Sequence, residues 1–328
     1  MENISKKNYQ LIIIGAGPIG IACGIAAKNA GLEYLIIEKG SLVNSLYHYP
    51  VNMQFFSTSE RLEIGGVPFM TLHPKPKKQE ALEYYRRVVQ NFSLHINYHE
   101  KVESVIQEGR TQFLIQSSKK QYHTQNIIVS TGFYDRPQLL NIPGENLTKV
   151  KHYYTDPHQY AFQKVVVIGA QNSAVDAALE TWRKGAEVTM VIRANEIGQR
   201  VKYWVRPDII NRIEEGSIQV YYQSCLTAIR EDEVDIQTAE KLITLQNDFV
   251  IAMTGYLPDF TLLENMGIKI SDDADKKPFY DETTMETNIP GIYLAGVVCG
   301  GMNTHQWFIE NSRNHADMIV SHILQKQT

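Results

Sequence analysis

The sequence predicts an α/β protein that is built on two βαβ units. In the first unit, residues 9–38, an apolar run (11–14) is followed by a glycine-rich turn, a stretch of small residues and a second apolar run. The second unit starts at Lys164 and repeats this order, with apolar runs at 165–168 and 187–192. Short apolar runs are typical of buried strands, and a strand–helix–strand order is typical of parallel sheets. We therefore expect two three-layer α/β domains.

The turn in the first unit is a G-x-G-x-x-G motif formed by Gly15, Gly17 and Gly20. In a dinucleotide-binding unit, the first glycine allows a tight turn, the second lets the backbone approach a pyrophosphate, and the third lets helix and strand pack closely. The N-terminus of the following helix offers N–H groups and a partial positive charge to the phosphates. The second strand ends in Glu38, where an acid accepts hydrogen bonds from ribose hydroxyls. The motif and its context predict a Rossmann-like dinucleotide site.

The second unit carries a degenerate form of the same motif. Gln171 replaces the middle glycine, and Ala174 replaces the last one, where alanine is acceptable. The second strand ends at Arg193, and an arginine binds a 2′-phosphate with a bidentate fork, so NADPH is expected in preference to NADH. The alternative is that Arg193 is a solvated strand end. The residues predicted to bind NADPH are Gly169, Gln171, Asn172, Ser173, Ala174, Arg193, Arg200 and Lys202.

The composition is that of an ordinary globular protein. The chain has 328 residues, 43% of them hydrophobic, and a net charge of −4, so its bulk charge does not indicate a nucleic-acid partner. No apolar run is long enough to span a bilayer, and the polar N-terminus is too short for a signal peptide. The three cysteines have no paired spacing, which predicts neither a disulfide framework nor a metal site. We expect a cytoplasmic protein without membrane association.

The order of these segments predicts a discontinuous first domain. It takes residues 1–140 and 280–328, and the second domain, residues 141–279, is inserted between them. The prolines at 137 and 143 mark the first linker, and the charged stretch 271–278 indicates a surface turn near the second.

Three short segments resemble a known family: Ser130-Thr131-Gly132, Thr254-Gly255-Tyr256 and the Pro-Gly-Ile-Tyr-Leu-Ala-Gly run at 290–296. They are similar to flavoproteins with two dinucleotide-binding domains and low-molecular-weight thioredoxin-reductase architecture. More narrowly, segments 52–58, 201–208 and 308–311 resemble the YpdA type, the bacillithiol disulfide (bacilliredoxin) reductases. The resemblance implies that the first domain binds FAD, that the inserted domain binds NADPH, and that the protein is a homodimer.

The same resemblance implies a set of FAD-binding positions. Relatives usually carry Gly-Asp where this chain has Gly296-Val297, and their aspartate bonds the ribitol of FAD. In this chain, we expect a backbone group or another side chain to make that contact. The implied FAD residues are Gly15, Gly17, Pro18, Ile19, Gly20, Glu38, Lys39, Gln54, Thr131, Gly132, Gly296 and Val297.

The sequence lacks the thiols that such reductases use. It contains no C-x-x-C, which thioredoxin reductases need, and Ile19 stands where YpdA relatives typically place a cysteine. The remaining candidates for a redox or proton-transfer role are Cys23, Cys299 and His305. A buried free cysteine usually behaves as a small hydrophobe, and a histidine in this position is more often a capping or surface residue.

The expected reaction is hydride transfer from NADPH to FAD, followed by electron transfer to an acceptor. Three acceptor classes remain open: a low-molecular-weight disulfide (bacillithiol disulfide) or a bacilliredoxin; a ferredoxin or flavodoxin, which needs no protein thiol; and dioxygen, as in an NADPH oxidase or monooxygenase. A non-catalytic, nucleotide-responsive flavin-binding protein is the alternative from another class. Tight flavin binding without reduction by NADPH would indicate that alternative.

Overall fold

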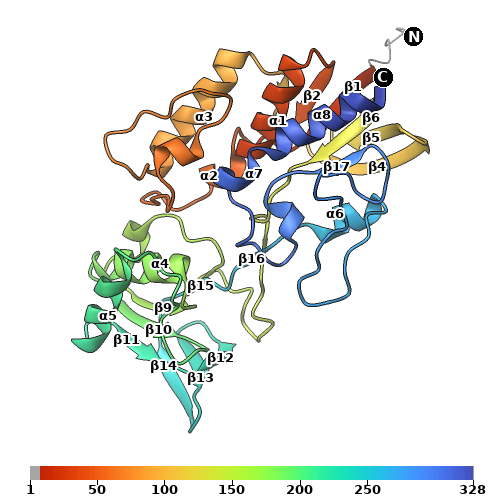
Figure 1. Cartoon of the computed structure of the whole chain (residues 1–328). Helices are drawn as coiled ribbons and strands as arrows, with labels where there is room; N and C mark the ends of the chain where they lie inside the picture. Colours follow the sequence, from red (N-terminus) through yellow and green to blue (C-terminus); the bar gives the residue numbers. More distant parts are fainter. Residues whose placement is uncertain (1–7, 328) are drawn as a thin grey trace. The chain divides into compact units, whose positions relative to one another are not determined.

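Two compact units divide the chain in the computed structural model, which describes residues 8–327 (Figure 1). Unit 1 contains residues 8–48, 53–136 and 256–327, and unit 2 contains residues 49–52 and 137–255. The chain leaves unit 1 after Arg136 and returns to it at Tyr256. The strands at these two points, β7 (Arg136–Pro137) and β16 (Tyr256–Leu257), pair as a short two-stranded sheet.

The chain returns to unit 1 at Tyr256, earlier than the boundary predicted at residue 280. Hydrogen bonds explain the difference, because Asn288 accepts from the backbone N–H of Lys269 (2.9 Å) and donates to the carbonyl of Gly267 (2.9 Å). These contacts tie the segment before residue 280 to the segment that follows it. The charged turn at 271–278 is therefore a loop within unit 1.

Unit 1 is built on a seven-stranded sheet in the order β3-β2-β1-β6-β5-β4, with β17 also paired to β6. Strand β6 changes its partner along its length: residues 121–124 pair antiparallel with β5, and residues 127–129 pair parallel with β17. The C-terminal strand β17 thus completes the parallel half of the sheet. The strands are β1 (Asn8–Ile14), β2 (Tyr34–Ile37), β3 (Ile96–Asn97), β4 (Val102–Gly109), β5 (Gln112–Ser117), β6 (Gln121–Val129) and β17 (Ile292–Leu294).

Helices cover this sheet, and the first and last of them pack against each other, so that helices from both ends of the sequence lie in one layer (Figure 1). The helical segments of unit 1 are α1 (Pro18–Asn29), α2 (Asn44–Tyr47), η1 (Ser59–Leu62), α3 (Lys78–Phe92), α6 (Phe260–Asn265), η3 (Val297–Gly300), α7 (Ile309–Ser312) and α8 (His315–Gln327).

The packing of α1 against β1 depends on two glycines. Gly15 has φ +107°, and a Cβ there would lie 2.7 Å from the carbonyl oxygen of Ser130. A Cβ on Gly20 would collide with the carbonyl oxygen of Gly15 and lie 2.7 Å from Ser130 Oγ. By contrast, a Cβ on Gly17 would have no described atom within 4 Å. Gly15 and Gly20 are therefore required by the fold itself, whereas the fold does not explain Gly17.

Unit 2 is built on a five-stranded parallel sheet in the order β11-β10-β9-β15-β8. Alternate residues of β9 face opposite layers, because Val165 and Val167 pack with α4 whereas Val166 and Ile168 pack with a second, antiparallel sheet. This arrangement gives three layers. The elements are β8 (Val150–Lys151), η2 (Pro157–Tyr160), β9 (Lys164–Ile168), α4 (Asn172–Trp182), β10 (Glu187–Val191), α5 (Arg206–Glu214), β11 (Gln219–Tyr221), β12 (Cys225–Ile229), β13 (Glu233–Gln237), β14 (Leu242–Gln246) and β15 (Phe249–Ala252).

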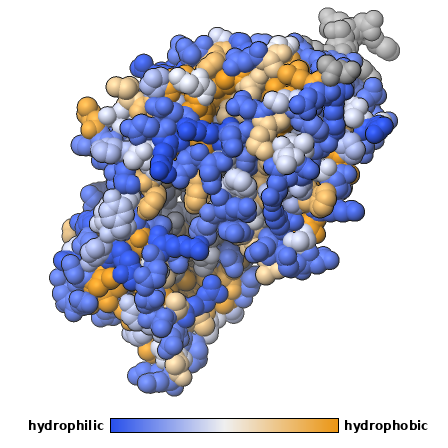
Figure 2. All heavy atoms as spheres, viewed as in Figure 1, coloured by the Kyte–Doolittle hydropathy of each residue, from blue (hydrophilic) through white to orange (hydrophobic). Residues whose placement is uncertain are grey.

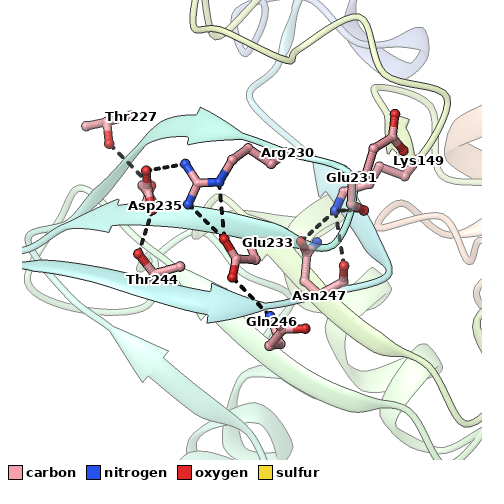
Figure 3. Close-up of polar contacts among 9 residues, drawn as sticks. All are labelled: Lys149, Thr227, Arg230, Glu231, Glu233, Asp235, Thr244, Gln246 and Asn247. Atoms are coloured by element: carbon pink, nitrogen blue, oxygen red, sulfur yellow. Dashed lines mark hydrogen bonds and ion pairs between the residues drawn. The ribbon is translucent and has the colours of Figure 1, made fainter.

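Figure 3 shows the polar contacts of the antiparallel sheet β12–β14 in unit 2. Arg230 donates two hydrogen bonds to the Asp235 carboxylate (2.6 Å each), and Thr244 donates a third (2.8 Å). These bonds lower the pKa of Asp235 to about 2. At the end of the sheet, the buried Lys149 ammonium donates to the carbonyl of Glu231 (2.7 Å) and to Asn247 Oδ1 (2.8 Å). The network joins this sheet to the segment that enters unit 2.

The visible surfaces of both units are mainly hydrophilic, with scattered hydrophobic groups (Figure 2). Within the described residues, none of the helices combines the length and the apolar character that crossing a membrane requires. In the same part of the chain, no group of three or more His, Cys, Asp or Glu side chains is placed to hold a metal ion.

We predict that Gly20→Ala destabilises the protein, because its methyl group has no space between α1 and the carbonyl of Gly15. Overpacking of this kind costs about 1–3 kcal/mol of unfolding free energy. Urea unfolding of the apoprotein, followed by circular dichroism, measures the effect. Gly17→Ala is the matched control, and its unfolding free energy should change by less than about 0.5 kcal/mol. Equal losses in the two variants would contradict this account.

Candidate functional sites

The N-terminus of α1 presents bare backbone. Its N-cap is Gly17, with φ −70° and ψ 176°, and within residues 8–327 no side chain caps the helix. The first helical hydrogen bond runs from Ile21 N to Gly17 O (2.9 Å). The space in which a Cβ of Gly17 would project is open among the described atoms. This bare helix end, preceded by a glycine turn, fits a pyrophosphate group.

Glu38 lies directly after β2 and closes the glycine turn. Its Oε2 accepts from Ala16 N (2.7 Å) and its Oε1 accepts from Gly40 N (2.9 Å), and the residue is buried. Burial raises the pKa of Glu38, and these two backbone hydrogen bonds oppose that effect. Each carboxylate oxygen can accept a further bond, so the carboxylate can hold the turn and still accept a hydroxyl.

Ser130 contributes to this region although the sequence analysis did not select it as a site residue. Its Oγ donates to the carbonyl of Ile14 (3.0 Å) and lies 3.1 Å from that of Gly15, so it joins the end of β6 to the glycine turn. Thr131 and Gly132 follow, partly exposed, and Gly132 has φ +75°. The Ser-Thr-Gly motif at 130–132 points to this region of the sequence. It does not predict that Ser130 contacts Gly15, which is distant in sequence.

The structure brings the start of α1 and the end of β17 together. A Cβ on Gly296, which has φ +84°, would lie 3.3–3.5 Å from the side chain of Ile19. Val297 is partly exposed at the start of η3. Three of the predicted FAD positions thus meet at one place. Ile19 puts an aliphatic group against the Gly296 turn.

Two other predicted FAD positions make contacts elsewhere in unit 1. Gln54 donates through Nε2 to the carbonyl of Lys75 (3.2 Å). Lys39 forms an ion pair with Asp135. Neither contact tests whether Gln54 or Lys39 binds FAD, so both roles stay predictions.

The two buried cysteines of unit 1 are poor redox groups. Cys23 and Cys299 are both 0% exposed. Burial raises the pKa of Cys23 to about 12, with a smaller contribution from Asp317, and burial raises the pKa of Cys299 as well. Because the thiolate is the nucleophile in disulfide exchange, neither thiol is activated for that reaction. The geometry disfavours Cys23 and Cys299 as the redox groups considered in the sequence analysis.

His315, rather than His305, contacts the turn after β17. Its Nδ1 accepts from Gly296 N (3.3 Å) and lies 4.0 Å from Cys299 Sγ, whereas His305 is exposed. Burial lowers the pKa of His315 to about 4, so the imidazole is neutral at pH 7. Since Nδ1 is an acceptor, the ring proton resides on Nε2.

Unit 2 has a similar turn at the start of α4. Gly169 has φ +124°, and a Cβ placed on it would lie 2.6 Å from Met253 O and 3.1 Å from the Cβ of Ala174, so glycine at position 169 leaves the space that the alanine at the third position of the motif occupies. The Gln171 amide lies against Gly198, 2.6–2.7 Å from where a Cβ of that glycine would be. This contact places the Gln171 side chain beside the loop that contains Gly198. Ser173 is exposed in the first turn of α4.

Asn172 holds the loop that carries two of the predicted cations. Its Nδ2 donates to Arg200 O (3.1 Å), and its Oδ1 accepts from Lys202 N (2.8 Å). Lys202 is buried and pairs with Asp176 (2.7 Å), whereas Arg193 and Arg200 are exposed. Of the three cations predicted at the NADPH site, the two arginines are therefore the exposed ones.

Comparisons with known proteins agree with this architecture. The family described as "Pyridine nucleotide-disulphide oxidoreductase" matches residues 12–296. "Bacilliredoxin reductase Bdr" of Bacillus subtilis is 44% identical over 317 residues, which cover 96% of this chain and 98% of that protein. The structure "Bacillithiol Disulfide Reductase Bdr (YpdA) from Bacillus cereus" superposes with a TM-score of 0.95 at 42% identity, covering 98% of this chain and 100% of that chain. "Ferredoxin--NADP reductase 2" of Oceanobacillus iheyensis is 25% identical, covering 96% of each chain.

These similarities confirm the predicted resemblance to YpdA-type reductases, the α/β fold class and an oxidoreductase rather than a non-catalytic binding protein. The predicted cofactors, FAD and NADPH, are those of this type of reductase. The chain belongs to the pyridine nucleotide-disulphide oxidoreductase family.

Proposed function

We propose that this protein is an FAD-dependent NADPH oxidoreductase that passes electrons to a bacillithiol-type disulfide or to a bacilliredoxin. The observation that supports the acceptor is the 44% identity, over 96% of the chain, to a bacilliredoxin reductase. The glycine turns at the starts of α1 and α4 support one dinucleotide site in each unit.

In unit 1, both backbone groups and side chains bind FAD. The bare N-terminus of α1, at Gly17 and Pro18, faces the pyrophosphate, and Glu38 accepts hydrogen bonds from the ribose. Ser130 is a positioning residue, because it holds the glycine turn in place. When bound, FAD supplies the chemistry of accepting a hydride and releasing electrons to the acceptor.

In unit 2, the glycine turn before α4 receives the pyrophosphate of NADPH. Arg193, exposed just after β10, and Arg200 bind the 2′-phosphate. Asn172 positions the loop of Arg200 through its two backbone contacts. Lys202 acts indirectly, because its ammonium pairs with Asp176.

The burial of the cysteines in unit 1 favours a second class of acceptor, one that needs no protein thiol. Ile19 puts an aliphatic side chain at the Gly296 turn, and Cys23 and Cys299 are buried with raised pKa values. A ferredoxin or flavodoxin takes electrons from a flavin without any protein thiol, so it is the alternative acceptor. We place the reaction in the cytoplasm and expect a homodimer.

Anaerobic stopped-flow spectroscopy tests the proposed function. We expect stoichiometric NADPH to bleach the flavin absorbance of the purified holoprotein. Bacillithiol disulfide, added with its bacilliredoxin, should then restore that absorbance. A flavin that stays reduced with these, yet reoxidises with flavodoxin or ferredoxin, would move the assignment to the second class. Reoxidation by dioxygen alone would indicate an oxidase.

We predict that Gly17→Val weakens FAD binding without unfolding unit 1, because its side chain enters the open space at the start of α1. The Kd for FAD, measured by flavin fluorescence during reconstitution of the apoprotein, should rise at least about tenfold, which is about 1.4 kcal/mol. The control is Gly109→Val in β4 of the same unit, where φ is not positive and a Cβ would make only ordinary contacts, at 3.6 Å or more. An unchanged Kd for FAD in Gly17→Val would contradict the placement of the pyrophosphate.

We predict that Arg193→Ala raises the KM for NADPH about tenfold or more, because hydrogen bonds to a charged group contribute about 1.5–3 kcal/mol each. The KM for NADH should change little, since NADH lacks the 2′-phosphate. Lys241→Ala, which removes an exposed cation from a turn in the same unit, is the matched control. Steady-state kinetics with both nucleotides measures the effect, and equal changes for NADPH and NADH would overturn the assignment.

A further inference from the structure

The loop between β10 and α5 presents an aromatic ring to solvent. Tyr203 is 71% exposed, although it contacts its neighbour Trp204. The two rings meet edge to face, with centroids 4.8 Å apart and an interplanar angle of 82°. Trp204 is half-buried, so this contact supports the exposed ring from the body of unit 2. A ring held in this way offers a flat face on which a heterocyclic base can stack.

The segment before Tyr203 is tied to the N-terminus of α4. The Asn172 side chain, in the first turn of α4, donates to Arg200 O (3.1 Å) and accepts from Lys202 N (2.8 Å). The side chain of Val201, between these two contacts, is buried in the core of unit 2. Tyr203 is the next residue, so it starts close to the helix end where we place the pyrophosphate of NADPH.

The segment after Tyr203 is tied to the carboxyl end of β11. Arg206, the first residue of α5, pairs with Glu196 of the loop (3.8 Å). Both act on Tyr222, directly after β11: burial raises the pKa of its hydroxyl, Arg206 opposes that effect and Glu196 adds to it. Glu196 also accepts from Gln199 Nε2 (2.8 Å), so this acid is engaged within the loop. Tyr203 therefore lies between the start of α4 and the ends of β10 and β11.

The strand order of unit 2 gives the direction in which a dinucleotide lies. The order reverses at β9, because β10 and β11 follow on one side of it and β15 lies on the other. A dinucleotide binds across the carboxyl ends of the strands at such a point, with its pyrophosphate at the helix after the first strand. The residue after the second strand, here Arg193, contacts the ribose of adenosine. The adenine base thus extends over β10 towards β11, where the loop presents Tyr203.

We propose that Tyr203 stacks on the adenine ring of NADPH. The proposal rests on the proposed function and adds a second contact at the adenosine end of the nucleotide. The 2′-phosphate contact of Arg193 distinguishes NADPH from NADH, whereas stacking on adenine strengthens the binding of both. The nicotinamide ring is not the stacking partner, because it lies beyond the pyrophosphate, in the other half of the crevice.

Isothermal titration calorimetry of the oxidised holoprotein with 2′,5′-ADP tests this contact without any turnover. This probe contains the adenine and the 2′-phosphate of NADPH but no nicotinamide. The variants are Tyr203→Ser, which removes the ring, and Tyr203→Phe, which keeps the ring and removes the hydroxyl. The matched control is Phe162→Ser, because Phe162 is an 85% exposed aromatic residue of the same unit that precedes β9, at the amino end of the strand.

We predict that Tyr203→Ser raises the Kd for 2′,5′-ADP about tenfold, within the range that stacking of a base on an aromatic ring contributes. Tyr203→Phe and Phe162→Ser should bind the probe as wild type does. In anaerobic flavin reduction, the half-saturating concentrations of NADPH and NADH should rise by the same factor in Tyr203→Ser. Reduced nicotinamide mononucleotide, which has no adenine, should reduce the flavin of this variant at the wild-type rate.

The outcomes separate the stacking contact from the proposed function. A wild-type flavin that NADPH does not reduce would contradict the proposed function. Normal reduction with an unchanged Kd for 2′,5′-ADP in Tyr203→Ser would overturn the stacking contact alone. An equal rise of the Kd in Tyr203→Phe would assign the effect to the hydroxyl, and a rise for NADPH without one for NADH would assign it to the 2′-phosphate. Slower reduction of Tyr203→Ser by the mononucleotide would show a wider disturbance of the site, and each of these three results would overturn the proposal.

Discussion

The close contact between α1 and the glycine turn is the constraint on which unit 1 depends. Gly20 must lack a Cβ because the carbonyl of Gly15 occupies that space, and Ser130 closes the same contact from β6. This contact positions the N-terminus of α1 at the end of β1. It also brings Ala16 N within reach of Glu38. The predicted pyrophosphate and ribose positions are therefore consequences of one packing requirement.

Unit 2 meets the same requirement less strictly. Ala174 stands where unit 1 has Gly20, and Gly169, which has no Cβ, leaves room for its methyl group. Gln171 stands where unit 1 has Gly17, and its amide packs on Gly198. The two units thus share one strand–turn–helix design, and they differ at the position that we propose faces a ligand. This difference is consistent with different cofactors in the two units.

The strongly periodic parts of the fold were predictable from sequence, because alternating or continuous apolar runs and glycine turns act locally. Both βαβ units, including the N-terminus of α1 and the strand end at Glu38, follow from such patterns. Contacts between distant segments were not predictable. The Ser130 contact, the pairing of Lys202 with Asp176 and the burial of Cys299 all depend on residues far away in sequence. The boundary expected at residue 280 differs from the division of the chain at Tyr256 for the same reason, since Asn288 donates a hydrogen bond back to the carbonyl of Gly267.

The pairing of β6 with β17 has a consequence for how the protein is made. The parallel half of the sheet in unit 1 is incomplete until residues 292–294 have left the ribosome, although β1 emerges first. Unit 2 is encoded almost entirely by residues 137–255, so its strands are all available earlier. Domains generally fold as units during synthesis, and long-range strand pairing is slow. The inserted unit is thus ready to fold while the first unit still waits for its last strand, with the apolar edge of β6 exposed to chaperones in the meantime.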